Sequence, residues 1–132
     1  MPRVSHAFFF VAVLYAIAGM AWGIHMAESG DHVQLPAHAH LNLLGWVANA
    51  IFGTYFAFHP GRFTKNAWVT FLLSNVGVLV LIPSLAMLIA EGESPTSQWI
   101  LPTSVGTVIV LLGMVSFAIA VCRGMFGPQK TS

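Results

Sequence analysis

Two histidines, His38 and His40, lie one residue apart within the largely apolar segment PAHAHLNLLGW at positions 36–46. Imidazole is the commonest metal ligand among side chains, and it also holds haem iron. On a helix each residue turns the chain by about 100°, so the two rings would point about 200° apart. They cannot easily hold one ion together, because a helical zinc pair needs a spacing of four residues. The pair therefore predicts one imidazole for each of two pockets, and a cofactor with two axial positions, such as haem, suits that arrangement.

Asn42 and Gly45 follow on the helical face of His38. Gly45 would let either a flat macrocycle or another helix come close, because it has no side chain. We therefore predict His38 and His40 as cofactor ligands, and Asn42 and Gly45 as further cofactor contacts. The alternative for the histidines is hydrogen bonding between helices, which stabilises membrane bundles by only about 0.6 kcal/mol per bond. Gly19 and Gly23 form a GxxxG step, which indicates helix packing.

A second group of side chains with metal-binding chemistry precedes this segment. Two imidazoles and two carboxylates fall within one helical turn and a short loop: His25, Glu28, Asp31 and His32. Imidazole suits both copper and zinc. The group predicts a second metal site that holds copper or zinc, and the alternative is a polar loop in contact with water.

The composition predicts that lipid surrounds the chain. Hydrophobic residues make up 57% of it and charged residues only 7%, whereas a soluble domain carries about 25% charged residues. So few charges cannot cover a surface that faces water. The basic residues are scattered and form no stripe, which excludes nucleic acid as a partner. The single cysteine excludes an intramolecular disulfide and a CxxC metal site.

Charged residues divide the chain into four long uncharged stretches, and a membrane span needs about 20 mostly apolar residues. We predict transmembrane helices near residues 4–26, 36–58, 67–90 and 99–123. Short loops make neighbouring helices antiparallel. The predicted fold is all-α, a single integral membrane four-helix bundle over residues 1–132.

The charges also predict the orientation in the membrane. The basic residues lie at the N-terminus, in the second loop or near the C-terminus: Arg3, Arg62, Lys65, Arg123 and Lys130. The acidic residues lie in the first and third loops: Glu28, Asp31, Glu91 and Glu93. By the positive-inside rule, both termini are cytoplasmic. We expect a multi-pass protein of a bacterial-type inner membrane.

The motif HAHLNLLGW at 38–46, preceded by SGDH at 29–32, resembles the signature of small membrane proteins related to cytochrome c oxidase subunit I. The likeness covers roughly residues 19–55 and points to the haem-copper oxidase family. In those enzymes, subunit I has twelve helices in three four-helix arcs, and a His-x-His pair on one helix ligates two different haems. The resemblance implies that His38 and His40 match that pair and ligate haem b.

Other features of the family are missing from the sequence. The chain has one arc instead of three, and it lacks the histidines that hold copper beside the high-spin haem. No Lys, Glu or Asp lies in the middle of a predicted span to make a proton channel. We therefore do not expect oxygen reduction or proton pumping.

The missing arcs suggest a homotrimer, since three copies would restore twelve helices. Each pocket would then receive His38 from one chain and His40 from the next. We expect electron transfer through this shared haem to a redox partner that the sequence does not identify. One alternative is a haem protein that binds or senses NO or O₂ at an open iron position. Another is an accessory subunit of a membrane oxidase complex, without a cofactor.

Overall fold

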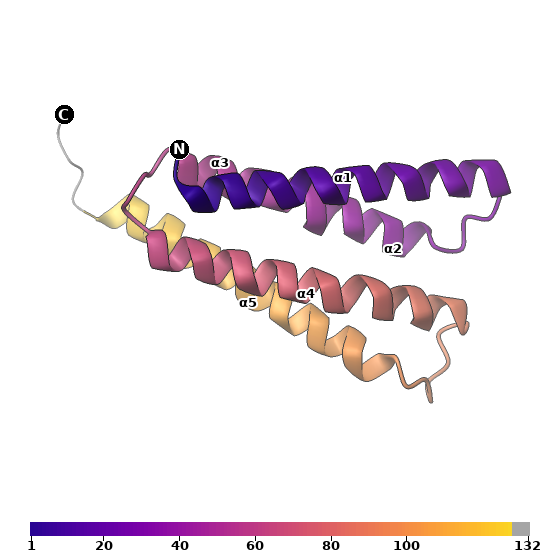
Figure 1. Ribbon diagram of the computed structural model, residues 1–132. Coiled ribbons are helices and arrows are strands. Elements are labelled where there is room, and N and C mark those ends of the chain that lie inside the picture. The colour runs from indigo at the N-terminus through magenta and orange to yellow at the C-terminus, as the bar shows by residue number, and fades with distance from the viewer. Residues whose placement is uncertain (128–132) are drawn as a thin grey trace.

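The computed structural model describes residues 1–127, and within them every regular element is helical (Figure 1). Lys130, one of the predicted basic residues, lies outside the described residues. The elements are α1 (Arg3–Ser29), α2 (Leu35–His40), the π-helix η1 (Leu41–Val47), α3 (Ala48–Ala57), α4 (Thr64–Ala90) and α5 (Ile100–Phe126). Because α2, η1 and α3 follow one another without a break, we call Leu35–Ala57 the composite helix.

Three of the helices, α1, α4 and α5, are long and apolar enough to cross a membrane. Each has 27 residues, which at 1.5 Å per residue gives about 40 Å and exceeds the roughly 30 Å hydrocarbon core. The chain is thus suited to pass the membrane several times. The fourth predicted span coincides with the composite helix, whose crossing of the membrane stays a prediction.

Glycine and proline set several helix boundaries. Gly30 ends α1 in the left-handed conformation (φ 68°), and its N–H donates to Met26 O. Pro36 occupies the first turn of α2, where a backbone N–H is not needed. Pro83 lies inside α4 without ending it, and the neighbouring Ser84 hydroxyl donates to Val80 O at 2.7 Å. Pro83 leaves the carbonyl of Leu79 without its helical N–H donor, while the Ser84 hydroxyl bonds to the next carbonyl along the same helix.

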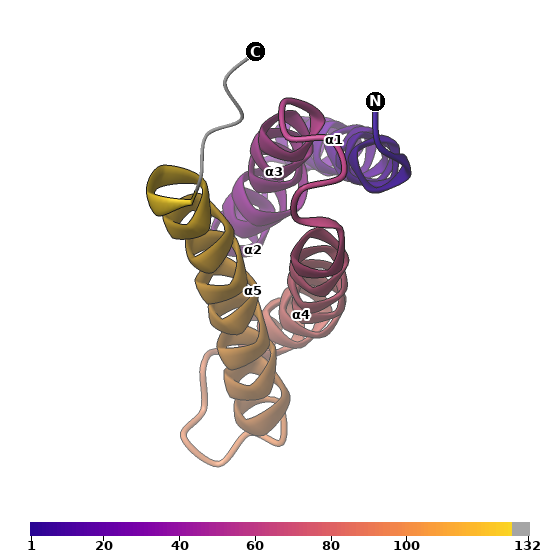
Figure 2. The same ribbon diagram turned by 90° about the vertical axis from the view of Figure 1, so that its left-hand side faces the viewer.

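The helices pair as two antiparallel hairpins. α1 packs along η1 and α3, and α4 packs along α5, so the hairpins lie side by side with α4 against the composite helix (Figure 1). Viewed along the bundle, α5 is inclined against α4 (Figure 2).

The two ends of the bundle differ in charge. The start of α1, the loop 58–63 and the end of α5 lie together at one end (Figure 1); we call it the basic end, for Arg3, Arg62, Lys65 and Arg123. The loops 30–34 and 91–99 lie at the opposite end; we call it the acidic end, for Glu28, Asp31, Glu91 and Glu93. The three-dimensional arrangement therefore gathers the charges as the antiparallel prediction requires.

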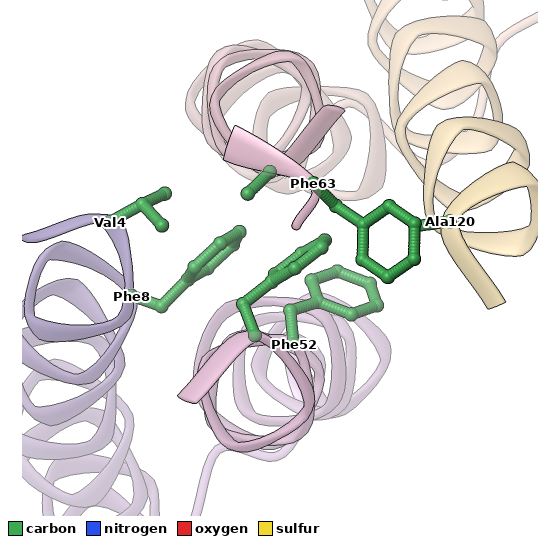
Figure 3. Packing of buried hydrophobic residues seen from close by; sticks show 7 residues of the cluster. Val4, Phe8, Phe52, Phe63 and Ala120 are labelled. Atoms are coloured by element: carbon green, nitrogen blue, oxygen red, sulfur yellow. The ribbon is translucent and has the colours of Figure 1, made fainter. Parts of the chain in front are cut away.

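An aromatic core near the basic end packs α1, α3, α4 and α5 together (Figure 3). Phe8 of α1 meets Phe52 of α3 edge-on at 5.8 Å between ring centroids. Phe52 in turn lies 4.5 Å from Phe117 of α5. The buried residues of this core are Val4, Phe8, Phe52, Phe56, Phe63, Ala67 and Ala120. Aromatic pairs of this geometry contribute about 0.5–1.5 kcal/mol each beyond simple burial. They therefore stabilise the packing of the helices at the basic end.

A pair of buried amides links the two hairpins further along the bundle. Asn49 Nδ2 donates to Asn75 Oδ1 at 3.2 Å, and Asn75 Nδ2 donates to Asn49 Oδ1 at 3.0 Å. Each amide also reaches a carbonyl of its own helix, Gly45 O at 2.7 Å and Phe71 O at 2.8 Å. The two amides therefore hydrogen-bond the composite helix to α4.

The α4–α5 hairpin is closed by small residues. Gly106 and Gly113 are buried on α5 at a seven-residue spacing. A Cβ added at Gly106 would lie 2.7 Å from Leu81 N, and one at Gly113 would lie 2.9 Å from Ser74 N. The two backbones therefore touch, as they do at the small-residue interfaces of membrane helices.

Candidate functional site

The two predicted histidines end α2, and the π-helix begins at the next residue. Four buried positions of the composite helix follow at spacings of four: Ala37, Leu41, Gly45 and Asn49. In an α-helix a step of four turns about 400°, so such a stripe would drift by about 40° per step. The wider π turns, closed by i to i+5 bonds, absorb that drift. The π-helix therefore keeps these four positions on one face of the composite helix. His38 and His40 point to opposite sides of that face.

His38 is half-buried and turned toward α1. The ring of Trp22 stands edge-on to it at 6.2 Å between centroids. A Cβ added at Gly23 would lie 3.2 Å from Cε1 of His38. The GxxxG motif of α1, Gly19 and Gly23, thus packs against His38 and Asn42. The helix packing predicted for this motif therefore occurs beside the candidate site.

Asn42 lies beside His38 and holds it. Its Nδ2 donates to His38 O at 3.1 Å and lies 3.2 Å from Nε2 of the ring. Gly19 faces Asn42 so closely that a Cβ there would collide with the amide oxygen. The structure therefore brings together His38 and Asn42, as predicted from their spacing. Both lie inside the first hairpin, which is formed by α1 and the composite helix.

His40 is exposed on the other flank of the helix. Its Nδ1 lies 2.7 Å from Pro36 O. Because a carbonyl only accepts, Nδ1 carries the proton and the lone pair resides on Nε2. Metal-bound histidines use this arrangement, in which the second ring nitrogen donates to a backbone carbonyl. His40 therefore has the tautomer of a ligand and faces away from its own chain.

Gly45 is buried against α1. A Cβ added there would lie 2.8 Å from Cγ of Tyr15. The close approach of another helix, one of the two roles predicted for Gly45, is present in the structure, and its contact with a cofactor stays a prediction.

The second predicted metal group does not converge within the chain. His25, Glu28, Asp31 and His32 are all exposed. Asp31 Oδ1 accepts from Val33 N at 3.0 Å, and His32 Nδ1 lies 3.1 Å from Gly30 O, so both side chains bond to the local backbone. Over residues 1–127, no three or more His, Cys, Asp and Glu side chains group as a metal site. The copper or zinc site stays a prediction.

An apolar groove on the composite helix was not predicted from the sequence. It has a volume of about 570 Å³ and is lined by Trp46, Val47, Ala50, Ile51, Thr54, Tyr55 and Phe58. Thr54 Oγ1 donates to Ala50 O at 2.8 Å, so its hydroxyl is already satisfied. Exposed Leu43 connects the groove to His40 in steps of three and four residues. That recurrence of large apolar residues on the His40 side was the available sequence signal.

Comparisons of the chain with protein-family models, with curated proteins and with solved structures found no significant match. The likeness to oxidase subunit I thus stays a resemblance of one motif, and the function proposed below depends on the geometry of the two histidines.

Proposed function

We propose that this chain is a membrane protein that binds haem b between copies of itself and transfers electrons. The observation that carries the proposal is the exposed His40, whose Nδ1 is occupied by Pro36 O at 2.7 Å. An imidazole near the end of a membrane helix is costly to leave facing lipid, so it needs a partner from outside the chain. Haem iron is a partner that the remaining Nε2 lone pair can bind.

The chemistry of both histidines fits an axial ligand. The Asn42 amide nitrogen lies 3.2 Å from Nε2 of His38 and 3.5 Å from Nδ1, so the amide can donate to a ring nitrogen of His38. His40 has its Nε2 directed away from Pro36 O, and Nε2 is the atom that would ligate iron. His38 would exchange the Asn42 amide for the metal. When bound, a six-coordinate haem supplies a one-electron couple.

The two ligands would come from different copies. His38 is packed against α1 while His40 is exposed on the opposite flank, so one chain cannot direct both rings to the two faces of one macrocycle. A ring of copies in which each chain gives one histidine to each of two pockets solves this, and a homotrimer would also restore twelve helices. The groove beside Leu43 would supply an apolar wall.

The same proposal gives the chain four spans and places the basic end on the cytoplasmic side of a bacterial-type inner membrane. Support comes from the separation of charge, since the described basic residues and the acidic residues lie at opposite ends of the bundle.

A second candidate is a haem protein with an open iron position that binds NO or O₂. The contacts of His38 with Asn42 and Trp22 favour it. If His38 keeps these contacts, it does not bind the iron, and His40 is then the one axial ligand. Carbon monoxide separates the candidates, since it binds ferrous iron only where a position is open.

The visible spectrum of the purified protein, with and without dithionite, tests the proposal. We expect a six-coordinate low-spin haem that does not react with carbon monoxide, in an oligomer whose native mass includes haem. A protein purified without haem, and unable to take it up, would contradict both candidates. The chain would then be better explained as a cofactor-free subunit of an oxidase complex.

A further inference from the structure

The ring nitrogens of His38 both lie close to a donor of the same chain. The amide nitrogen of Asn42 is 3.2 Å from Nε2 and 3.5 Å from Nδ1 of the ring. A neutral imidazole carries its proton on one of these nitrogens and a lone pair on the other. In either tautomer the lone pair is therefore within hydrogen-bond reach of the amide, so the atom that would bind a metal already has a partner.

The backbone fixes the orientation of this amide. Asn42 Nδ2 donates to His38 O at 3.1 Å. Because a carbonyl oxygen only accepts, the nitrogen of the amide, and not its oxygen, lies on this side. One N–H bonds to the carbonyl and the second is available to the ring. The amide therefore keeps a hydrogen bond, and its place, when the ring turns away from it.

Gly19 of α1 holds the amide from the other side. A Cβ added at Gly19 would collide with Oδ1 of Asn42 and would lie 2.9 Å from its Cγ. Gly23, the second glycine of the GxxxG motif, approaches the ring instead, since a Cβ there would lie 3.2 Å from Cε1 of His38. Each glycine thus brings α1 against a different group, and a side chain at Gly19 would displace the amide first.

His40 has no comparable competitor. Its Nδ1 lies 2.7 Å from Pro36 O, and over residues 1–127 no side chain bonds to its Nε2. The exposed histidine can therefore offer its lone pair at once, whereas His38 must first give up a hydrogen bond. A hydrogen bond between neutral groups shifts an equilibrium by roughly two- to tenfold. The amide is thus expected to occupy the lone pair of His38 for most of the time.

We propose that Asn42 is a positioning residue that occupies the lone pair of His38 and thereby controls whether His38 is available to the cofactor. Gly19 keeps the amide in position for this task. The inference rests on the proposed function, since the cofactor is the haem of that site. While the ring bonds to the amide, His40 is the one histidine available; when the ring turns away, both are. The two candidate functions are then two states of one site.

The reactivity of the histidines toward diethylpyrocarbonate, which modifies an unprotonated ring nitrogen, tests the role of the amide in the full chain prepared without haem. Peptide mass spectrometry gives the rate at each histidine, and exposed His6 near the start of α1 is the internal reference. Asn42→Leu removes the amide and should raise the rate at His38 roughly two- to tenfold. Gly19→Ala keeps the amide but displaces it, so the rate should rise there as well.

Asn66→Leu is the matched control. It removes the same kind of side chain from α4, where Asn66 Nδ2 donates to Ser116 O at 2.6 Å, and it should leave the rate at His38 unchanged. If Asn42→Leu does not raise that rate, or if Asn66→Leu raises it equally, Asn42 does not occupy the lone pair and the proposal is overturned.

A second measurement separates this inference from the proposed function. Haem should pass to a soluble acceptor roughly two- to tenfold more slowly from Asn42→Leu than from the wild type, because the ring of His38 no longer has a competing partner. A wild type that takes up no haem would refute the proposed function, while the rates without haem would still decide whether the amide occupies the lone pair. An Asn42→Leu protein that reacts faster at His38 yet releases haem at the wild-type rate would overturn the control of ligation by Asn42.

Discussion

The α4–α5 hairpin and the hairpin of α1 with the composite helix differ in how their backbones approach each other. In α5 the buried Gly106, Gly113 and Ala120 repeat every seven residues, a period that an α-helix meets with two turns and a slight supercoil. In the composite helix the buried positions repeat every four residues, and a π-helix is needed to keep them aligned. One hairpin is regular, and the other departs from regularity next to its histidines.

The difference extends to the polar groups. The second hairpin packs through hydroxyls and through the amides of Asn66 and Asn75; Thr70 Oγ1, for example, lies 2.9 Å from Ser116 Oγ. The first hairpin contains imidazoles; on its composite helix, His38 packs against Gly23 and His40 is exposed. We infer that α4–α5 is scaffold and that the first hairpin contains the site. Each variant below tests that division, from the largest expected effect to the smallest.

The largest effect is expected from His40→Ala. Every pocket would lose one axial ligand, so the haem should become five-coordinate or be lost, and the ferrous form should begin to bind carbon monoxide. His38→Ala should behave alike, because both histidines are needed at each pocket. Absorption spectra with and without carbon monoxide measure this. A His40→Ala protein that keeps a six-coordinate haem would remove His40 from the site.

A mixed oligomer sharpens the ligand prediction. When His38→Ala and His40→Ala chains are co-expressed, an intact His38 faces an intact His40 at about a quarter of the pockets in a randomly assembled ring. Six-coordinate haem should return in that proportion. If neither single variant binds six-coordinate haem and the mixture does not either, the ligands are not shared between neighbours.

The next largest effect is expected from Gly106→Leu in the scaffold. The added side chain would meet the backbone of Leu81, since even a Cβ would lie 2.7 Å from its nitrogen, and we expect a loss of about 3 kcal/mol, at the upper end for overpacking. Thermal unfolding in detergent measures it. Ala118→Leu, at an exposed position of the same helix, is the control and should change stability by less than about 0.5 kcal/mol.

A smaller effect is expected from Asn75→Leu, which tests the hydrogen bonds between Asn49 and Asn75 that link the two hairpins. It leaves Asn49 Oδ1 without its donor at 3.0 Å, and an unpaired buried acceptor costs about 1–2 kcal/mol. The Gly45 O contact of Asn49 stays, so the haem spectrum should not change. If Asn75→Leu alters the spectrum while Gly106→Leu does not, the site depends on the second hairpin more than we infer.

The smallest effect is expected from Gly23→Ala. The new methyl group would lie 3.2 Å from Cε1 of His38, which a small shift of the ring relieves, so stability should change by less than about 1 kcal/mol. The axial ligation should respond more visibly, as a shift in the low-spin absorption bands or in the midpoint potential. Ala27→Val, at an exposed position of the same helix, should alter neither.

Much of the fold was predictable because lipid leaves the backbone few choices. Within a bilayer each N–H and C=O must be satisfied by the chain itself, so apolar stretches become helices. The predicted helices begin within three residues of α1, the composite helix, α4 and α5. The pairing of His38 with Asn42 followed from their spacing alone.

The π-helix and the groove were not predictable in the same way. A helix adopts i to i+5 bonds where packing rewards them, and the partners of Leu41 and Gly45 are residues distant in sequence, such as Tyr15. The seven-residue spacing of Gly106 and Gly113 is visible in the sequence and is typical of close helix packing. Proximity along the chain does not by itself bring His25, Glu28, Asp31 and His32 together, because Asp31 and His32 bond to the local backbone, and the metal site there stays a prediction.

The π-helix also means that the composite helix accommodates one residue more than an ordinary α-helix of the same number of turns would. Removing one residue between Leu41 and Val47 would restore ordinary α-helical bonding, and the tighter α turns would offset the lost residue, so that α2 keeps nearly the same orientation relative to α3. Both imidazoles would therefore keep their directions around the helix axis. A single-codon deletion in this segment would thus spare the histidines, whereas a substitution at His38 or His40 would remove one of them. Related chains that are one residue shorter within this segment should present their histidines to the same neighbours.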